Sequence, residues 1–291
     1  MHPLITSILK EKKAVLTDGA WGTQLQLKGL KTGENPDSLC LSDPEIVESV
    51  AQSYVNAGSN VILTNTFGAN RFVLSKFGLA DKVKEINRAA VTISKKAAAD
   101  KALVFASIGP SGQLLMNNEA LKNELKKAFA EQAAAIASAK ADAIIIETMS
   151  NLKEAVLAIE AAKETALPVV ACMVFDAGRD KDRTIMGDTI ENVVQTFTGL
   201  GVDVIGSNCG HGILGFIPIC KRMRSLTGLP LWMKANAGLP VLEHGKSVYK
   251  ADKADFAAAA IELIGAGANF VGGCCGTTPE FISELSARLN E

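Results

Sequence analysis

The sequence of 291 residues lacks any long hydrophobic run and any marked excess of one charge. A membrane-spanning helix needs about 20 consecutive apolar residues, and no window of this chain reaches that length. The segment from Met1 to Lys13 also lacks the apolar stretch of a secretory signal peptide. The formal net charge is −1 and no run of Lys or Arg stands out, which argues against nucleic acid and anionic membrane as partners.

Cysteine and histidine are also scarce. Six cysteines at irregular spacings do not resemble the disulfide framework of a secreted domain. We therefore expect reduced thiols and a cytoplasmic location. The three histidines, His2, His211 and His244, leave few candidates for a histidine general base.

Short apolar segments alternate with longer segments of helical periodicity along the whole chain. Most of the short segments are nearly continuous in apolar character, which is typical of parallel strands covered on both faces. We expect strands at 14–17, 60–66, 102–108, 142–148, 167–175, 202–208, 229–235 and 269–273. We expect helices at 44–57, 80–99, 119–140, 152–164, 189–200, 214–226 and 255–265, with a last helix near the C-terminus. Asp43-Pro44 and Thr278-Pro279 each place an N-cap residue before a proline in the first turn.

Eight strand–helix repeats in one chain predict the α/β class and a single (β/α)8 TIM barrel. No linker or low-complexity tract divides the sequence, so we expect one domain spanning residues 1–291. An open doubly wound sheet has the same alternation. Its Gly-x-Gly-x-x-Gly fingerprint is missing after the first strand, where residues 18–23 read Asp-Gly-Ala-Trp-Gly-Thr. The count of eight units therefore favours a closed barrel.

Polar residues follow the expected strands at their C-terminal ends. In strand order they are Asp18, Asn65, the turn 109–112, Glu147, Asp176, Cys209, Asn236 and the pair Cys274-Cys275. In a closed barrel these ends form one rim, where barrel enzymes place their active sites. Adjacent strands lie about 4.8 Å apart. Side chains from the last three strands can therefore meet around one ion.

The pair Cys274-Cys275 is flanked by glycines on both sides. Neighbouring residues of a strand point to opposite faces, so both sulfurs reach one ion only if the backbone turns, which glycine permits. Cys209 offers a third thiol. Three thiolates with one open position describe a catalytic zinc site better than a structural site, which closes with four ligands. Two alternatives are buried cysteines that act as small apolar residues and a vicinal disulfide.

The remaining thiols and the rim carboxylates have more ordinary interpretations. Cys40, Cys172 and Cys220 are expected in a loop, within a strand and in a helix, respectively, and we assign them to packing. Asp18 and Glu147 are either structural acids, an acid–base pair, or acceptors for the ammonium group of an amino acid substrate. The last role leaves the chemistry to the thiol site. His211, near Cys209, is either a substitute metal ligand or a solvated loop residue.

With these residues identified, the chain resembles the zinc-dependent homocysteine S-methyltransferase family, particularly the homocysteine-binding module of cobalamin-dependent methionine synthase. The resemblance extends from Leu16 to Ile282. It rests on segments 18–23, 34–37, 57–60, 64–67, 147–148, 208–209, 236–240 and 272–279, of which Gly-Gly-Cys-Cys-Gly-Thr-Thr-Pro is the most specific.

The resemblance implies roles for particular residues. Cys209, Cys274 and Cys275 would be the catalytic zinc ligands, and Asn236 would fill the fourth position until the substrate arrives. Glu147 would hold the substrate's amino group, and the turn from Gly19 to Thr23 would offer backbone N–H groups to its carboxylate. The implied substrate-binding set is Asp18, Gly19, Ala20, Trp21, Gly22, Thr23, Asn65, Glu147 and Asn236.

The implied function is cytoplasmic methionine biosynthesis, in which homocysteine is activated as a zinc thiolate and methylated. Thr148 stands where the betaine-using branch has tyrosine, which favours the synthase-like branch. The sequence has no Asp-x-His-x-x-Gly cobalamin motif and no second barrel for folate. Cobalamin would therefore act only through a separate methylcorrinoid protein.

Two alternatives remain open. One is a zinc methyltransferase in an anaerobic methyl-transfer system with a different thiol or methyl donor. The other is a non-catalytic zinc-binding barrel. The departures from the family pattern are Trp21, where a smaller or more flexible apolar residue is usual, and His211-Gly212-Ile213, where Gly-Pro is more common.

Overall fold

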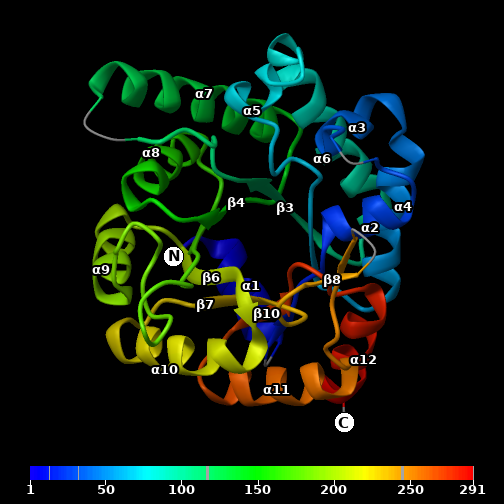
Figure 1. Cartoon of the computed structure of the whole chain (residues 1–291), viewed down its shortest axis with the longest axis vertical. Helices are drawn as coiled ribbons and strands as arrows, with labels where there is room; N and C mark the ends of the chain where they lie inside the picture. Colours follow the sequence, from blue (N-terminus) through cyan, green and yellow to red (C-terminus); the bar gives the residue numbers. More distant parts are fainter. Residues whose placement is uncertain (13, 32, 116–117, 244–245, 291) are drawn as a thin grey trace.

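Eight parallel strands form a closed barrel in the computed structural model, which describes residues 1–12, 14–31, 33–115, 118–243 and 246–290 (Figure 1). A bridge between Thr17 and Val61 joins the first and last strands of the sheet and closes it. In sheet order the strands are β1 (Val15–Leu16), β10 (Phe270–Gly273), β7 (Leu231–Asn236), β6 (Val204–Gly212), β5 (Val169–Met173), β4 (Ala143–Met149), β3 (Leu103–Ile108) and β2 (Val61–Leu63). The predicted (β/α)8 barrel is confirmed.

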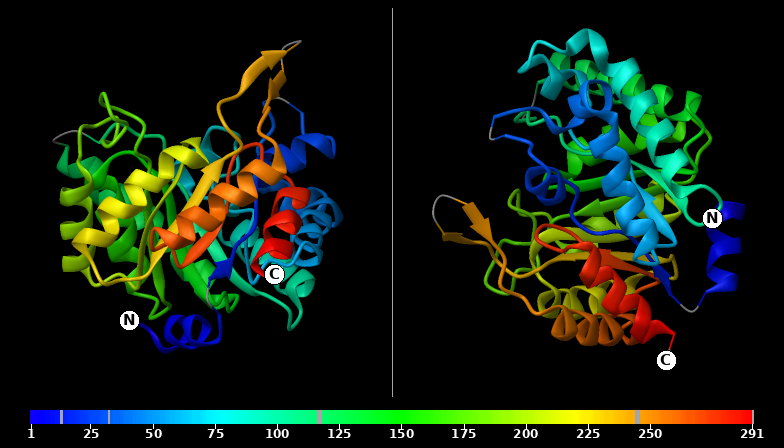
Figure 2. Two further views of the ribbon diagram at one scale, coloured as in Figure 1. Left: turned by 90° about the horizontal axis from the view of Figure 1, so that it is seen from below. Right: turned by 90° about the vertical axis from the view of Figure 1, so that its right-hand side faces the viewer.

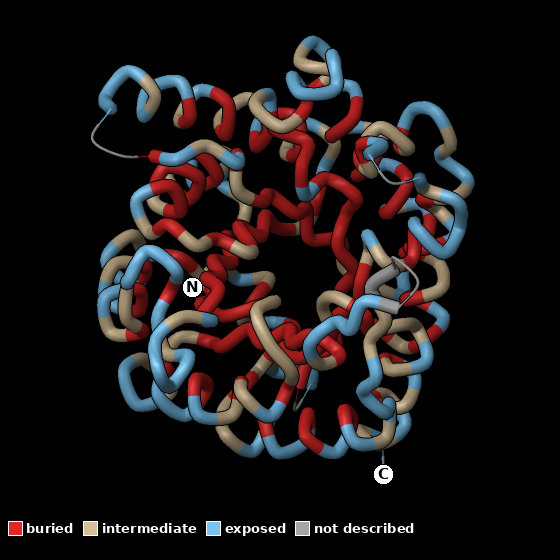
Figure 3. Tube along the Cα trace, in the orientation of Figure 1, coloured by how far each residue is buried: buried red, intermediate tan, exposed pale blue. Residues whose placement is uncertain are grey.

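Helices surround the barrel and their outer faces are exposed, whereas the strands form a buried ring (Figure 3). The α-helices are α1 (Pro3–Glu11), α2 (Trp21–Leu27), α3 (Leu39–Ser42), α4 (Pro44–Asn56), α5 (Arg71–Ser75), α6 (Val83–Ala98), α7 (Glu119–Ser138), α8 (Leu152–Lys163), α9 (Ile190–Leu200), α10 (Phe216–Leu226), α11 (Lys253–Gly265) and α12 (Pro279–Leu289). Short 3-10 turns are η1 (Pro36–Ser38), η2 (Ala80–Lys82) and η3 (Ile213–Gly215). Among helices of the described residues, none combines the length and apolar character needed to cross a bilayer.

The expected elements agree with the structure except in detail. Asp43 caps α4 by accepting the N–H of Ile46 as expected. Thr278 stands at the N-cap of α12, but its side chain accepts no backbone N–H there. Its hydroxyl donates instead to Glu280, so Thr278 holds the predicted N-cap position without a side-chain bond to the backbone. Cys40 lies in α3 and not in a loop, because the segment before it turns helical.

Two elements that the periodicity does not reveal define the ends of the barrel. Helix α1 places Ile5 and Ile8 in the same buried cluster as the inward-facing strand residues, so it covers the N-terminal end. The hairpin of β8 (Val241–Glu243) and β9 (Lys246–Val248) projects from the opposite end (Figure 2). The C-terminal rim is therefore the end that remains available for a ligand.

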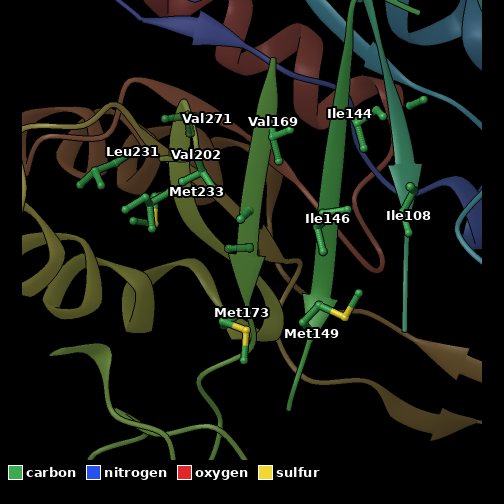
Figure 4. Packing of buried hydrophobic residues seen from close by; sticks show 14 of the residues in the cluster. Ile108, Ile144, Ile146, Met149, Val169, Met173, Val202, Leu231, Met233 and Val271 are labelled. Carbon is green, nitrogen blue, oxygen red and sulfur yellow. The ribbon is translucent and has the colours of Figure 1, made fainter. Parts of the chain in front are cut away.

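The apolar core has an inner and an outer layer. Inside the barrel, Trp232 stacks between Phe105, at a ring-centroid distance of 5.9 Å, and Phe270, at 5.2 Å. Residues of the opposite strand faces, such as Ile144 and Met233, pack in the layer beneath the helices (Figure 4). This filling of the interior excludes a channel through the barrel.

Gly206 lies where the barrel leaves no room for a side chain. A Cβ at this position would lie 2.0 Å from the backbone oxygen of Trp232 on the neighbouring strand. We expect Gly206→Ala to lower the free energy of unfolding by about 3 kcal/mol or more, because a strand must shift. Gly199→Ala is the matched control, since a Cβ there meets nothing within 4 Å and helix propensity favours alanine. Equal urea midpoints for the two variants would contradict this prediction.

Candidate active site

Three cysteine thiols meet at the C-terminal rim. The Sγ atoms of Cys209, Cys274 and Cys275 all lie within 4.8 Å of one another, and those of Cys209 and Cys275 are 3.9 Å apart. Sulfurs held by one tetrahedral zinc at about 2.3 Å would lie roughly 3.8 Å apart. All three are free thiols, so the vicinal disulfide considered above is not formed. The donor set and its spacing fit a zinc ion.

The backbone around the thiols is shaped to make them converge. Cys209 has a φ of 64°, a left-handed conformation that is uncommon for residues other than glycine. It interrupts the pairing of β6 with β7, where the register shifts between Asn208 and Gly212. The pair Cys274-Cys275 follows the end of β10 in a turn, as predicted. The Cys274 N–H donates to Ala235 O at 2.7 Å, which ties this turn to β7.

The thiols also depend on one another for their protonation. Hydrogen bonds from Cys274 and Cys275 lower the pKa of Cys209 to about 3. The same hydrogen bonding with Cys209 raises the pKa of Cys274 well above its usual range and that of Cys275 to about 11. Three crowded thiolates repel one another, so full ionisation of the cluster requires a cation.

Asn236 lies beside this cluster at the end of β7. Its Oδ1 accepts the Cys275 N–H at 3.0 Å, and its side chain hydrogen-bonds Cys209, which contributes to the low pKa of that thiol. The structure therefore brings the Asn236 side chain next to the thiols, and its role as a fourth metal ligand remains a prediction. An amide oxygen has two acceptor sites, so the bond to Cys275 leaves one of them.

Tyr249 is a neighbour of the thiols that the sequence analysis missed. Burial first, and then the negative charge and hydrogen bonding of Cys275, raise the pKa of its hydroxyl to about 12. A Cβ at Gly276, where φ is +80°, would lie 2.1 Å from the tyrosine ring. No motif or strand end marks Tyr249, because it follows the β8–β9 hairpin.

Glu147 is a buried carboxylate on β4 with neutral hydrogen-bond donors. Ser107 Oγ donates to its Oε1 at 2.5 Å, and Asn208 Nδ2 donates to its Oε2 at 3.2 Å. Burial raises the pKa of Glu147, partly offset by the positive charge of Lys234. Asn208 also accepts the Thr148 N–H at 2.7 Å. The carboxylate is therefore held in a fixed orientation close to the thiols.

Asp18 is fully buried at the end of β1 and has charged and neutral donors. Its Oδ2 accepts Trp21 Nε1 and Leu63 N, each at 2.7 Å. Its Oδ1 accepts Lys234 Nζ at 2.5 Å. Lys234 was missed by the sequence analysis, although a lysine within the apolar strand Leu-Trp-Met-Lys-Ala-Asn is itself unusual.

The segment 19–23, expected to be a turn that binds a carboxylate, instead enters helix α2 at Trp21, and it lies next to the cysteine turn. Ala20 N donates to Thr277 O at 3.2 Å, and Gly276 N donates to Thr23 Oγ1 at 3.4 Å. A Cβ at Gly22 would meet nothing within 4 Å, so this position borders open space. The structure brings this segment and the thiols together. Substrate binding by the segment remains a prediction.

Asn65 has a different neighbourhood. It is buried, and its Nδ2 donates to Pro36 O at 2.8 Å. A second contact joins its amide to Cys40 Sγ at 3.6 Å. These contacts attach the loop after β2 to the segment that follows α2. In the described part of the structure, the recorded partners of the amide thus belong to this segment, and its role in substrate binding remains a prediction.

Asp37, in the same segment, is expected to make stability depend on pH. Burial raises its pKa to about 7, above the value of about 3.9 in unfolded chains. The protonated carboxyl therefore stabilises the fold fully below about pH 4, and this contribution is lost as pH rises through about 7. The free energy of unfolding should fall by up to about 1.4 kcal/mol per pH unit in this window. Asp37→Asn should remove that slope in urea titrations at pH 5 to 8; parallel profiles would contradict it.

The other cysteines and His211 are not part of the thiol cluster. Cys40, Cys172 and Cys220 are buried, and burial raises the pKa of each, which makes them poor nucleophiles. The ring of His211 contacts Phe216 edge-on at 5.3 Å. Among the described residues, the cluster that could hold a metal ion contains the three rim thiols without His211. His244 lies outside the described residues.

Comparisons with known proteins point to one enzyme family. The model of the family described as homocysteine S-methyltransferase matches residues 15–289. Methionine synthase of Mycobacterium leprae is 30% identical over 308 residues, which cover 99% of this chain and 25% of that protein. Methionine synthase of Mycobacterium tuberculosis is 30% identical over 299 residues, with 96% and 25% covered. The chain thus spans about a quarter of the length of these curated relatives.

A solved structure supports the fold independently. The metallated form of the homocysteine methyltransferase MmuM from Escherichia coli superposes with a TM-score of 0.81. The two sequences are 24% identical, and the match covers 97% of this chain and 98% of that chain. At this identity the likeness concerns the barrel architecture.

Proposed function

The chain belongs to the homocysteine S-methyltransferase family, and we propose that it is a zinc-dependent enzyme that methylates homocysteine to methionine. The observation that carries the proposal is the convergence of three thiols, within 4.8 Å of one another, at the open rim of the barrel. A buried carboxylate, Glu147, lies close to the thiols, because the amide nitrogen of Asn208 is 3.2 Å from Glu147 Oε2 and 4.0 Å from Cys274 Sγ. This pairing suits a substrate that carries both a thiol and an ammonium group.

Cys209, Cys274 and Cys275 would hold the zinc ion, and the free acceptor site of Asn236 Oδ1 would complete the ligand set until the substrate binds. When bound, the ion would act as a Lewis acid and lower the pKa of the substrate thiol, which is otherwise mostly protonated at neutral pH. The three cysteine thiolates carry more negative charge than a dication neutralises. This surplus favours an electron-rich, nucleophilic sulfur.

Glu147 would accept the substrate's ammonium group and so aim its side chain at the cysteines. Ser107 and Asn208 fix both carboxylate oxygens, which reduces the entropy lost when the substrate is oriented. Residues 19–23 would contribute backbone N–H groups to the substrate carboxylate. These contacts support recognition of an amino acid thiol over a simple mercaptan.

The methyl group would come from a methylcorrinoid carried by another domain or another protein. The similarity to methionine synthases, of which this chain spans about a quarter, supports this assignment. The hairpin and the loops at the open rim would then face the donor. Betaine, a methylfolate and a sulfonium compound are the competing donors.

A direct assay tests the proposal. The zinc-loaded chain is incubated with homocysteine and, in turn, methylcobalamin, methyltetrahydrofolate, betaine and S-methylmethionine, and methionine is measured by mass spectrometry. We expect methionine from methylcobalamin and background levels when homocysteine is omitted. Methionine from another donor would replace the corrinoid assignment. If no donor yields methionine and homocysteine does not change the zinc X-ray absorption edge, the proposed function is wrong.

A further inference from the structure

Lys234 is a buried cation inside the barrel, close to the carboxylates of Asp18 and Glu147. Its side chain is 2% exposed, and that of its partner Asp18 is 0% exposed. It lies two positions after Trp232 on β7, so it points inward above the aromatic stack. Burying a charge is costly unless it is paired. The lysine therefore depends on the Asp18 carboxylate at 2.5 Å.

Asp18 in turn has little capacity left for a ligand. A carboxylate offers about four acceptor sites, and the protein occupies three of them with Lys234 Nζ, Trp21 Nε1 and Leu63 N. The ammonium group of Lys234 also balances the negative charge of Asp18. These contacts connect β7, β2 and the start of α2, so Asp18 links three elements at the C-terminal end of the barrel.

Glu147 differs from Asp18 both in its hydrogen-bond donors and in the lack of a contacting cation among the described residues. Its recorded donors in the described part of the chain, Ser107 and Asn208, are neutral. The positive charge of Lys234 lowers the pKa of Glu147 through space, but the direct ion pair of Lys234 is with Asp18. When Glu147 is ionised, no contacting cation of the described residues balances its charge. An incoming ammonium group is attracted to this carboxylate rather than to the balanced pair.

We propose that Lys234 is a positioning residue that engages Asp18 and leaves Glu147 as the sole carboxylate that binds the substrate's ammonium group. This inference rests on the proposed function and concerns how the pocket selects its amino acid thiol. It differs from the direct substrate contact that family resemblance implies for Asp18. In this chain Asp18 instead anchors Trp21 and the end of β2.

Charge-balanced replacement separates the two roles. Asp18→Asn and Lys234→Met, each alone, leave one buried charge without its partner and should lower the melting temperature. The double variant removes both charges and should recover most of that loss. The amide oxygen of asparagine can still accept the N–H groups of Trp21 and Leu63.

Ligand discrimination supplies the decisive measurement. Affinities for homocysteine and for 4-mercaptobutyrate, which lacks the amino group, are measured by isothermal titration on zinc-loaded protein. We expect the ratio of the two affinities, homocysteine over 4-mercaptobutyrate, to stay within about threefold of the parent's value in the double variant. Glu147→Gln should reduce the ratio by about tenfold or more. If the double variant folds but no longer binds homocysteine more tightly than 4-mercaptobutyrate, Asp18 or Lys234 contacts the ammonium group, and the inference is wrong.

Two further outcomes are distinguishable. If the double variant does not fold, a crystal structure of the parent with homocysteine decides, because the amino nitrogen must bond Glu147 and not Asp18. If the parent does not bind homocysteine, the proposed function fails and this inference fails with it. A parent that binds homocysteine and a double variant that does not discriminate would overturn the inference alone.

Discussion

Cys275→Ala is expected to abolish tight zinc binding and methyl transfer. The variant leaves two of the three thiols that lie within 4.8 Å of one another, and a pair of thiolates with one amide is a weaker donor set for zinc. Loss of residues that merely orient metal ligands costs about 10- to 100-fold in activity or affinity, so loss of a ligand should cost more than about 100-fold. Zinc content is measured by mass spectrometry after dialysis, and activity by methionine formation.

Cys220→Ala is the matched control for this variant. The residue is equally a free thiol, but it is buried in α10, and its recorded contact is with Leu263 O. Its replacement should leave the zinc content unchanged and cost only packing energy. Retention of stoichiometric zinc and full activity by Cys275→Ala would show that the cluster is not the metal site.

Removal of the metal should affect activity without unfolding the chain. The barrel is held together by its inner stack around Trp232 and by the layer beneath the helices, and neither includes the three rim thiols. A chelated sample should therefore retain its far-UV circular dichroism and a cooperative thermal transition. Simultaneous loss of zinc and of secondary structure would contradict this expectation.

Glu147→Gln is expected to weaken homocysteine binding by about 10- to 100-fold, which corresponds to the loss of a charged hydrogen bond. Glutamine has nearly the same shape but no charge, so it cannot balance the ammonium group. The effect should appear in the dissociation constant measured by titration and in KM. The affinity for 4-mercaptobutyrate should change much less.

Glu154→Gln is the control for replacing a buried glutamate by glutamine. Glu154 is also buried, and its carboxylate accepts the Ser111 N–H and hydroxyl. Its replacement should lower stability without changing discrimination between the two thiols. An equal loss for homocysteine and the analogue in Glu147→Gln would point to a disturbed pocket rather than to lost ammonium binding.

The fold was predictable because its signals are local and repeated. Each barrel strand is a short apolar run that must be covered on both sides, and eight such runs leave few architectures. The rim position of Cys209, Asn236 and the Cys274-Cys275 pair followed from the same rule, since parallel strands end on one side. Helix α1 and the β8–β9 hairpin were missed because their short patterns carry little periodic signal.

The sequence alone determined the barrel, the three thiols at strand ends and the glycines that let the cysteine turn form. Only the tertiary structure decided which carboxylate has a cation beside it. Lys234 and Asp18 are separated by 216 positions, and no periodic pattern relates them. Tyr249, which follows the β8–β9 hairpin, is likewise brought to the thiols by the fold and not by a local sequence pattern. Such pairings arise from strand order and side-chain direction inside a closed barrel, and these are properties of the folded chain as a whole.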